Sequence, residues 1–275
     1  MAKRFWVFIL ITGLLAFSHQ VRGQHKDSTK NFLSAGPGYS YYQLRNINMS
    51  PLLYKGHSLL ANLGHYIHKG PFISEFDFNF WFGSIKPSIN PARTLSAVNL
   101  VRFDLDYTIL HSIKKWKNPG ITAYVGGSWL NKNGIRIHNS YFNNAVDYDL
   151  ISSLAVSGAL KKSFRLLNLD FDLRYQLSLP FVNYSIVPGY VSSFPEKLAT
   201  TSDRDLLTVL KSGKIRSFSE IQRFCSKLSI DYNMKNDNAI RFTYYWDFIN
   251  NEVADPITPA SQGFIISTLF DLSKP

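Results

Sequence analysis

The chain has 275 residues and a formal net charge of +11, with 18% charged and 15% aromatic residues. Soluble proteins carry about 25% charged residues, so this composition argues against an ordinary soluble enzyme. The mean hydropathy of -0.09 is too low for a helical membrane protein. Cys225 is the only cysteine, which excludes an internal disulfide and a multi-cysteine metal site.

The first predicted element is an export signal over residues 1–23. A basic start is followed by the apolar run Phe5–Phe17, and cleavage is expected near Gly23. The run is shorter than the roughly 20 residues that a spanning helix needs, although a membrane anchor is the alternative reading. A short N-terminal segment, 24–31, is expected to precede one domain over 32–275.

Long stretches of alternating apolar and polar residues follow. They are Phe72–Phe82, Val101–Ile109, Leu167–Phe181 and Ile240–Phe248, and each places aromatic or aliphatic side chains on one face and mainly polar ones on the other. Strands of soluble proteins average about 5–6 residues, whereas a tilted membrane-spanning strand takes about 9–11. The lengths favour membrane strands, and a soluble exported β-sandwich is the alternative.

We expect an all-β fold, a closed antiparallel transmembrane β-barrel of about ten strands, because lipid offers no partner for an open sheet edge. The strand centres are expected near Gly38, Leu63, Phe76, Phe103, Ala123, Val156, Leu173, Lys227, Tyr244 and Ile266. The segment 183–213 is long for an unstructured loop, and a hairpin within it would give twelve strands.

The expected connections alternate between short and long, which predicts short periplasmic turns and long extracellular loops. The short connections are 68–71, 113–119, 162–166 and 234–238, and the long ones are 44–56, 83–92, 131–147, 183–213 and 250–261.

The polar faces of the expected strands carry acids and arginines, which suits an enclosed lumen where charges can pair. The predicted lumen charge network contains Glu75, Asp77, Arg102, Asp104, Asp106, Asp170, Asp172, Arg174, Arg223, Lys227, Arg241 and Asp247. Aromatic residues near strand ends are expected to lie at the two membrane interfaces, with Trp81, Phe82 and Trp129 on the outer side and Trp116 on the inner side.

Over Asn31 to Leu272 this pattern resembles bacterial outer-membrane β-barrel proteins as a class. The resemblance implies an outer-membrane location and contact with outer-membrane lipid. Such proteins often end on a strand with a terminal aromatic residue; here Phe270 lies in the last expected strand, but Ser273 to Pro275 follow it. No nucleic acid is expected as a partner of an exported protein.

The paired acids Asp104 and Asp106 raise a second possibility, a hydrolase acting on lipid or polypeptide. The segment from His138 to Ser140 loosely resembles a His-x-Ser element of outer-membrane lipid deacylases. Inward-facing cations offer the acids partners, so we expect no catalytic, cofactor or metal site.

The leading hypothesis is a non-enzymatic barrel, either a narrow channel or an accessory subunit of an envelope transport or secretion complex. The alternatives are the hydrolase and a general small-solute porin. An envelope partner would bind through the expected loops 131–147 and 183–213, since loops of this length often carry contacts.

Overall fold

The computed structural model describes residues 29–47, 50–89, 97–113, 120–138, 146–186, 210–251 and 257–273. The predicted export signal and most of the segment 24–31 lie outside the described residues. None of the described residues forms a helix long and apolar enough to cross a membrane.

The described residues form one 11-stranded antiparallel sheet. The strands are β1 (Lys30–Asn46), β2 (Ser50–Lys69), β3 (Phe72–Pro87), β4 (Val98–Ser112), β5 (Ile121–His138), β6 (Val146–Leu166), β7 (Leu169–Ile186), β8 (Lys214–Ser217), β9 (Ile221–Asn233), β10 (Ala239–Asn251) and β11 (Ile257–Asp271).

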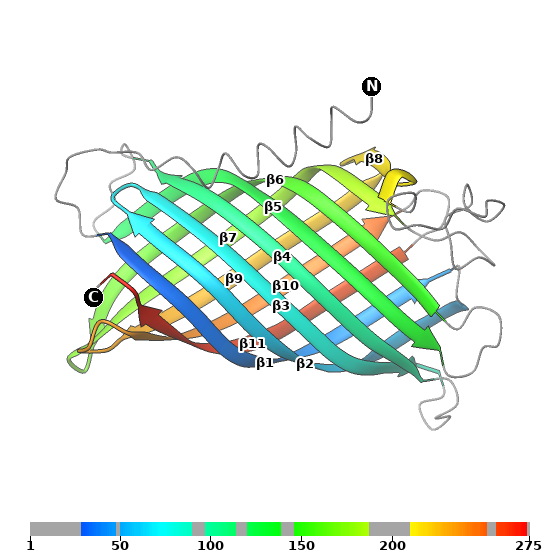
Figure 1. Cartoon of the computed structure of the whole chain (residues 1–275), viewed down its shortest axis with the longest axis horizontal. Coiled ribbons are helices and arrows are strands. Elements are labelled where there is room, and N and C mark those ends of the chain that lie inside the picture. The colour runs from blue at the N-terminus through cyan, green and yellow to red at the C-terminus, as the bar shows by residue number, and fades with distance from the viewer. Residues whose placement is uncertain are drawn as a thin grey trace.

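The sheet closes into a barrel. Strands β1 to β7 are neighbours in chain order, β7 pairs with β9, and β9, β10 and β11 lead back to β1 (Figure 1). Strand β8 is a short addition that pairs with β7. The predicted closed antiparallel barrel of about ten strands is therefore confirmed, and β8 does not insert into the ring as an extra spanning strand.

Side chains alternate between the lumen and the outer surface along each long strand. The outer surface exposes large apolar groups, with Leu59 at 66%, Phe82 at 61% and Ile266 at 55% exposure. Most lumen-facing positions away from the turn end are buried or half-buried, whether they are apolar or charged. An apolar band of this kind is stable only in lipid, and the closed sheet leaves its long strands no open edge there.

The two ends of the barrel differ. The turn end carries the start of β1, the end of β11 and the turns at 70–71, 167–168 and 234–238. The connection between β4 and β5 also lies at the turn end, and the loop end carries the remaining connections, including 88–97 and 187–213. Short turns face the periplasm in bacterial barrels, so we take the turn end as the periplasmic one.

Several predicted loops at the loop end prove too long, because strands continue into them. Residues 44–56 are mainly strand, since β1 ends at Asn46 and β2 begins at Ser50. Strand β3 continues to Pro87, into the predicted loop 83–92. In 131–147 the connection shrinks to 139–145, because β5 runs to His138.

Two further boundaries shift. Strand β10 reaches Asn251 and β11 begins at Ile257, inside the predicted loop 250–261. The predicted turn 162–166 is strand, and the turn falls at Leu167 and Asn168, whose φ angles are 52° and 63°. Asparagine tolerates this left-handed backbone, which suits a tight hairpin between twisted strands.

The pairing of β7 changes along its length. Its lower part, Asp170–Ser178, pairs with β9, and its upper part, Val182–Ser185, pairs with β8. Pro180, which has no N–H to donate to a neighbouring strand, lies between the two parts, opposite a register shift in β6. In Figure 1, β8 is the short yellow strand that leaves the wall at the loop end.

Candidate functional site

The lumen is divided into layers, and β3 passes through all of them from the turn end to the loop end. Ile73 and Glu75 line a cavity that opens at the turn end, which we call the vestibule. Asp77 lies further along β3 and lines a smaller inner cavity. Ile85, near the end of β3, belongs to an apolar cluster that closes the lumen.

Two ion pairs form the floor of the vestibule, one across the barrel and one between adjacent strands. Arg174 on β7 makes a two-point contact with Glu75 on β3. Arg241 on β10 pairs with Asp231, with an Nε to Oδ1 distance of 2.6 Å, and stacks over the Tyr66 ring at 4.4 Å. Four of these residues, Tyr66, Glu75, Arg174 and Arg241, line both cavities and so separate the vestibule from the inner cavity.

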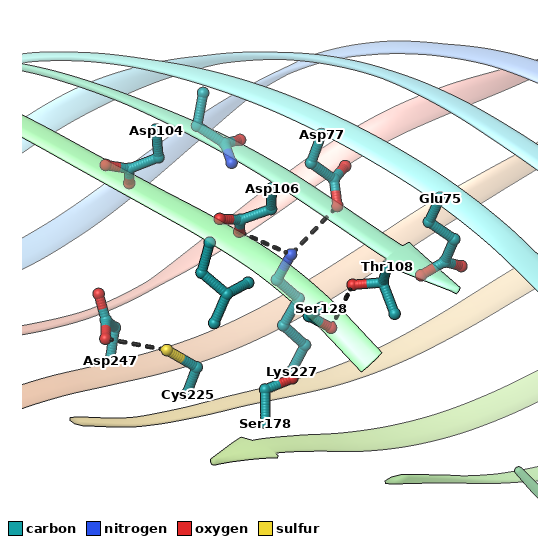
Figure 2. A network of polar contacts seen from close by, with 12 residues as sticks. Glu75, Asp77, Asp104, Asp106, Thr108, Ser128, Ser178, Cys225, Lys227 and Asp247 are labelled. Carbon is teal, nitrogen blue, oxygen red and sulfur yellow. Dashed lines mark hydrogen bonds and ion pairs between the residues drawn. The ribbon is translucent and has the colours of Figure 1, made fainter. Parts of the chain in front are cut away.

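The inner cavity measures about 60 Å³ and contains a lysine shared by two acids. The ammonium group of Lys227 lies 3.1 Å from carboxylate oxygens of both Asp77 and Asp106 (Figure 2). A cation between two carboxylates keeps both acids paired in a place where an isolated charge would be costly.

A row of hydroxyl groups crosses four adjacent strands beside this lysine. Thr108, Ser128, Ser157 and Ser178 are linked in that order by hydrogen bonds of 2.7, 2.6 and 2.7 Å. Figure 2 shows the first of these contacts next to Lys227. Each hydroxyl satisfies its neighbour, so this wall of the lumen is polar and needs no water to pair its groups.

Closer to the loop end than Lys227, another carboxylate, that of Asp247, accepts hydrogen bonds from three side chains. Asp247 accepts from Lys132 at 2.9 Å, from Arg223 at 3.2 Å and from the Cys225 thiol at 3.1 Å (Figure 2 shows the thiol contact).

A neighbouring pair completes this layer. Arg102 binds Asp104, which also accepts from the Trp81 indole at 3.0 Å. The Arg102 guanidinium lies 4.5 Å from the centre of that indole ring, a cation–π distance. Charges and rings together therefore fill the lumen at this height.

The loop end of the lumen is sealed by a buried arginine and an apolar cluster. Arg136 is fully buried and pairs with Asp147 and Asp149. Asn46 donates to Asp147 at 3.0 Å. The cluster consists of Tyr42, Leu44, Tyr54, Ile85, Val98, Leu100 and Ile257, all exposed by 3% or less.

The residues predicted for the lumen network occupy different depths. Most are buried or half-buried on the lumen face and contact one another across the barrel. Asp170 lies at the rim of the vestibule and pairs with exposed Arg165 at 2.7 Å. Asp172 pairs with Lys161 at 3.1 Å, so the two acids belong to separate pairs.

The prediction that Trp81 lies at the outer membrane interface is wrong. Trp81 is only 2% exposed and lies inside the lumen, because it shares the face of Asp77 and Asn79 on β3. Phe82 is 61% and Trp129 is 43% exposed on the outer surface. Trp116 lies outside the described residues.

Several charged lumen residues escaped prediction, among them Lys132, Arg136, Asp147 and Asp149. The first three lie in the range 131–147, which the sequence predicts to be a loop, and Asp149 lies two residues beyond it. Strand alternation could have predicted their lumen positions, because Lys132 and Arg136 are separated by even numbers of residues from the inward-facing Ser128 and Leu130 on β5.

The groups considered for catalysis already have partners. Asp104 is held by Arg102 and Trp81, and Asp106 by Lys227. His138 is placed next to Tyr54 at the loop end, with ring centres 6.4 Å apart, and Asn139 and Ser140 lie outside the described residues. Among the described residues, no group of three or more His, Cys, Asp or Glu side chains could hold a metal ion.

No family model and no curated protein matches the chain. Among solved structures it is similar to the outer membrane protease OmpT from Escherichia coli, with a TM-score of 0.47 and 8% identity over 92% of this chain and 99% of that one. It is also similar to the transport unit of the autotransporter AIDA-I from Escherichia coli, with a TM-score of 0.44 and 9% identity over 92% of both chains. An outer membrane channel from Pseudomonas putida F1 has a TM-score of 0.37 and 9% identity over 91% of this chain and 100% of that one.

These likenesses concern the barrel fold alone. The closed sheet, its apolar outer surface and its short turns at one end are features of the chain itself. They make it a β-barrel of the bacterial outer-membrane class, and its candidate functional site is the layered lumen.

Proposed function

We propose that this chain is a non-enzymatic outer-membrane barrel with a closed lumen, acting as an accessory subunit of an envelope transport or secretion complex. The observation that carries the proposal is the seal at the loop end. The seal residues Arg136, Leu44, Ile85 and Leu100 are each 1% exposed or less. The lumen is therefore closed between the inner cavity and the loop end.

Opening this lumen to water would be costly. The seal would lose apolar contacts, and the pairs of Arg136 and of Asp247 would have to separate or become hydrated together. Small barrels are commonly filled by inward side chains, whereas general porins are wider and keep an aqueous channel. A general solute porin is therefore the weaker alternative.

The conduction test uses purified protein in planar lipid bilayers, beside a general porin recorded under the same conditions. We expect no stable porin-sized conductance. The variant Leu44→Ala/Ile85→Ala/Leu100→Ala serves as a comparison, because shortening three seal residues should produce at least brief openings. Stable conductance of the unaltered protein would make solute diffusion the leading function.

The accessory role needs its own test. The connection 187–213 between β7 and β8 is the longest at the loop end and remains the proposed contact region, together with 139–145. We expect a protein partner to copurify in mild detergent and to be lost when 187–209 is replaced by a short linker. Retention of the partner would remove this region from the proposal, and isolation of the barrel alone would remove the accessory role.

The non-enzymatic part of the proposal is tested by lipid and peptide hydrolysis assays. We expect no activity above that of Asp104→Asn/Asp106→Asn. Activity in the unaltered protein that the double variant abolishes would make the chain a hydrolase.

A further inference from the structure

The vestibule at the turn end is a second feature of the lumen and is independent of the seal. It has a volume of about 820 Å³, within the range of small-molecule binding pockets. It opens at the turn end, and Arg174 and Glu75 form its floor. A cavity of this size with one mouth can hold a ligand without passing it through the barrel.

The acids of the vestibule are already neutralised. Glu75 is bound by Arg174, Asp231 by Arg241 and Asp172 by Lys161. Asp170 at the rim is held by Arg165. None of these carboxylates is left to attract a positively charged ligand.

Two basic residues of the lining have no such partner. Lys30 on β1 and His68 on β2 face each other in the β1–β2 ladder at the mouth. Among the described residues, neither side chain makes a hydrogen bond or an ion pair. Burial of the His68 ring and the nearby cations Lys161, Lys30 and Arg174 disfavour its protonated form. The positive charge at this side of the mouth therefore comes from Lys30, and the neutral His68 ring adds an N–H donor, a combination suited to an anionic group.

An apolar wall lies next to these basic residues. Phe32 follows Lys30 on the lumen face of β1, and Ala239 pairs with Leu269 across β10 and β11. Ile73 on β3 adds a further apolar group, packed with Leu110 and others near the turn end. The uncharged body of a ligand can contact this wall while its charged group stays at the mouth.

We propose that the vestibule binds an anionic amphiphile, with a phosphate or carboxylate group against Lys30, His68 and Lys161 and an alkyl portion along Phe32, in front of the buried side chains of Ala239 and Leu269. The same chemistry is present in a soluble amphiphile from the periplasm and in an anionic lipid of the bilayer leaflet around the turn end. The experiment below distinguishes these two sources.

The test uses the full barrel in nanodiscs of zwitterionic lipid, titrated with octyl phosphate by isothermal calorimetry, with empty nanodiscs subtracted. Inorganic phosphate and octanol are titrated in parallel. We expect saturable binding of octyl phosphate and binding at least about tenfold weaker for the other two, because each lacks one half of the recognition. Replacing part of the disc lipid with an anionic phospholipid identifies the source. If apparent affinity falls, the bilayer lipid occupies the site; if it is unchanged, the ligand is a soluble amphiphile.

Variants connect the signal to the vestibule. Lys30→Ala/His68→Ala removes the ammonium group and the ring N–H donor at the mouth and should raise the Kd for octyl phosphate at least about tenfold. Phe32→Ser should raise the Kd for octyl phosphate as well, because Phe32 is a half-buried apolar residue of the vestibule wall. Lys235→Ala is the matched control, since Lys235 is an exposed turn-end lysine outside the vestibule, and its Kd should match that of the unaltered protein.

Equal affinity in the unaltered protein and Lys30→Ala/His68→Ala, with both still folded as shown by anomalous gel migration, would overturn the proposal. Binding no greater than in empty nanodiscs would overturn it as well. Neither result depends on whether the barrel conducts or has a protein partner, so the two proposals fail separately.

Discussion

The pair between Arg174 and Glu75 joins residues 99 positions apart in the sequence. Their side chains are 11% and 10% exposed, so both charges are largely removed from water. Removing one member of a buried pair leaves an uncompensated charge and typically costs about 3–5 kcal/mol, whereas removing both can cost less. The pair therefore offers a direct test of the lumen network.

We expect Arg174→Ala to lower the free energy of unfolding more than Arg174→Ala/Glu75→Gln does. The measurement is denaturant unfolding in detergent micelles, arranged as a double-mutant cycle. The control cycle uses Arg165 and Asp170, which are 68% and 56% exposed and should show little coupling. Strict additivity at Arg174 and Glu75 would show that the two charges do not depend on each other.

The sequence predicts which strand face a residue occupies. It does not predict which lumen residues contact one another. Parity places Arg174 and Glu75 inside, but their contact depends on the stagger of strands across the barrel. The prediction for Trp81 fails for a different reason. Trp81 lies four residues after Asp77, so strand alternation places it on the lumen face, and only its aromatic character favours the membrane interface. In β5, Lys132 falls in the predicted loop 131–147, although its alternation with Ser128 and Leu130 continues the inward series of the strand.

Strand β7 is held to the start of β9 by a side chain where their backbone pairing ends. Asn183 on β7 is fully buried, accepts from Ser153 at 2.7 Å and donates to the carbonyl of Ile221 at 3.3 Å. It thus substitutes for the backbone hydrogen bonds that are absent beside Pro180.

We expect Asn183→Ala to loosen this junction, because leaving a buried carbonyl unpaired costs about 1–3 kcal/mol. Hydrogen exchange should accelerate in β8 and the first residues of β9, with the rest of the barrel unchanged. Ser229→Ala, which removes a hydroxyl contact lower on β9, is the control and should leave β8 unaffected. Unchanged exchange in the Asn183 variant would mean that the backbone alone holds the junction.

The outer surface of β3 gives a prediction about the membrane. Phe80 is 42% exposed on that surface, near the middle of the strand. An arginine at the bilayer midplane costs about 2–4 kcal/mol, so Phe80→Arg should reduce assembly into lipid vesicles, measured by the heat-modifiable gel band. Phe80→Leu keeps the apolar surface and should assemble normally. Equal assembly of both variants would contradict the lipid-facing assignment.

Strand positions were largely predictable, but strand ends were not. The strands continue into residues such as Arg136 and Asp147, where the polar composition resembles that of a loop. Near the β6–β7 turn, the apolar Leu167 continues the alternating series, so the sequence predicts it to be strand. It is 86% exposed in the hairpin turn, where backbone geometry matters more than side-chain type.

The closure of the barrel could be predicted from the sequence, because it follows from one physical condition. A sheet in lipid has to pair its edges, so alternating strands of spanning length lead to closure whatever their exact register. The positions at which two neighbouring strand backbones come too close for a side chain could not be predicted, because they depend on the local geometry of the sheet. Gly36 is such a position, since a Cβ atom there would lie 2.0 Å from the carbonyl oxygen of Ile266 on β11.

We expect Gly36→Ala to impair closure between β1 and β11 and to reduce the yield of heat-modifiable barrel. Gly158→Ala is the matched control, because the nearest atom to its Cβ would be 3.7 Å away, an ordinary contact. Equal yields from the two alanine variants would show that β1 and β11 can separate at this point without loss.

The contact between the first and last strands, β1 and β11, also has a consequence for the order in which the barrel folds. The amide of Asn31 donates to the hydroxyl of Ser273, a residue 242 positions away, and Leu272 donates back to the carbonyl of Asn31. Joining such distant segments costs more chain entropy than forming a hairpin such as β6–β7, and slow steps in folding follow such non-local contacts. Hairpins should therefore form early and the β1–β11 seam last. Until that seam forms, both of its edges are exposed and can pair with a neighbouring chain, so this interval is when the protein is most open to misassembly.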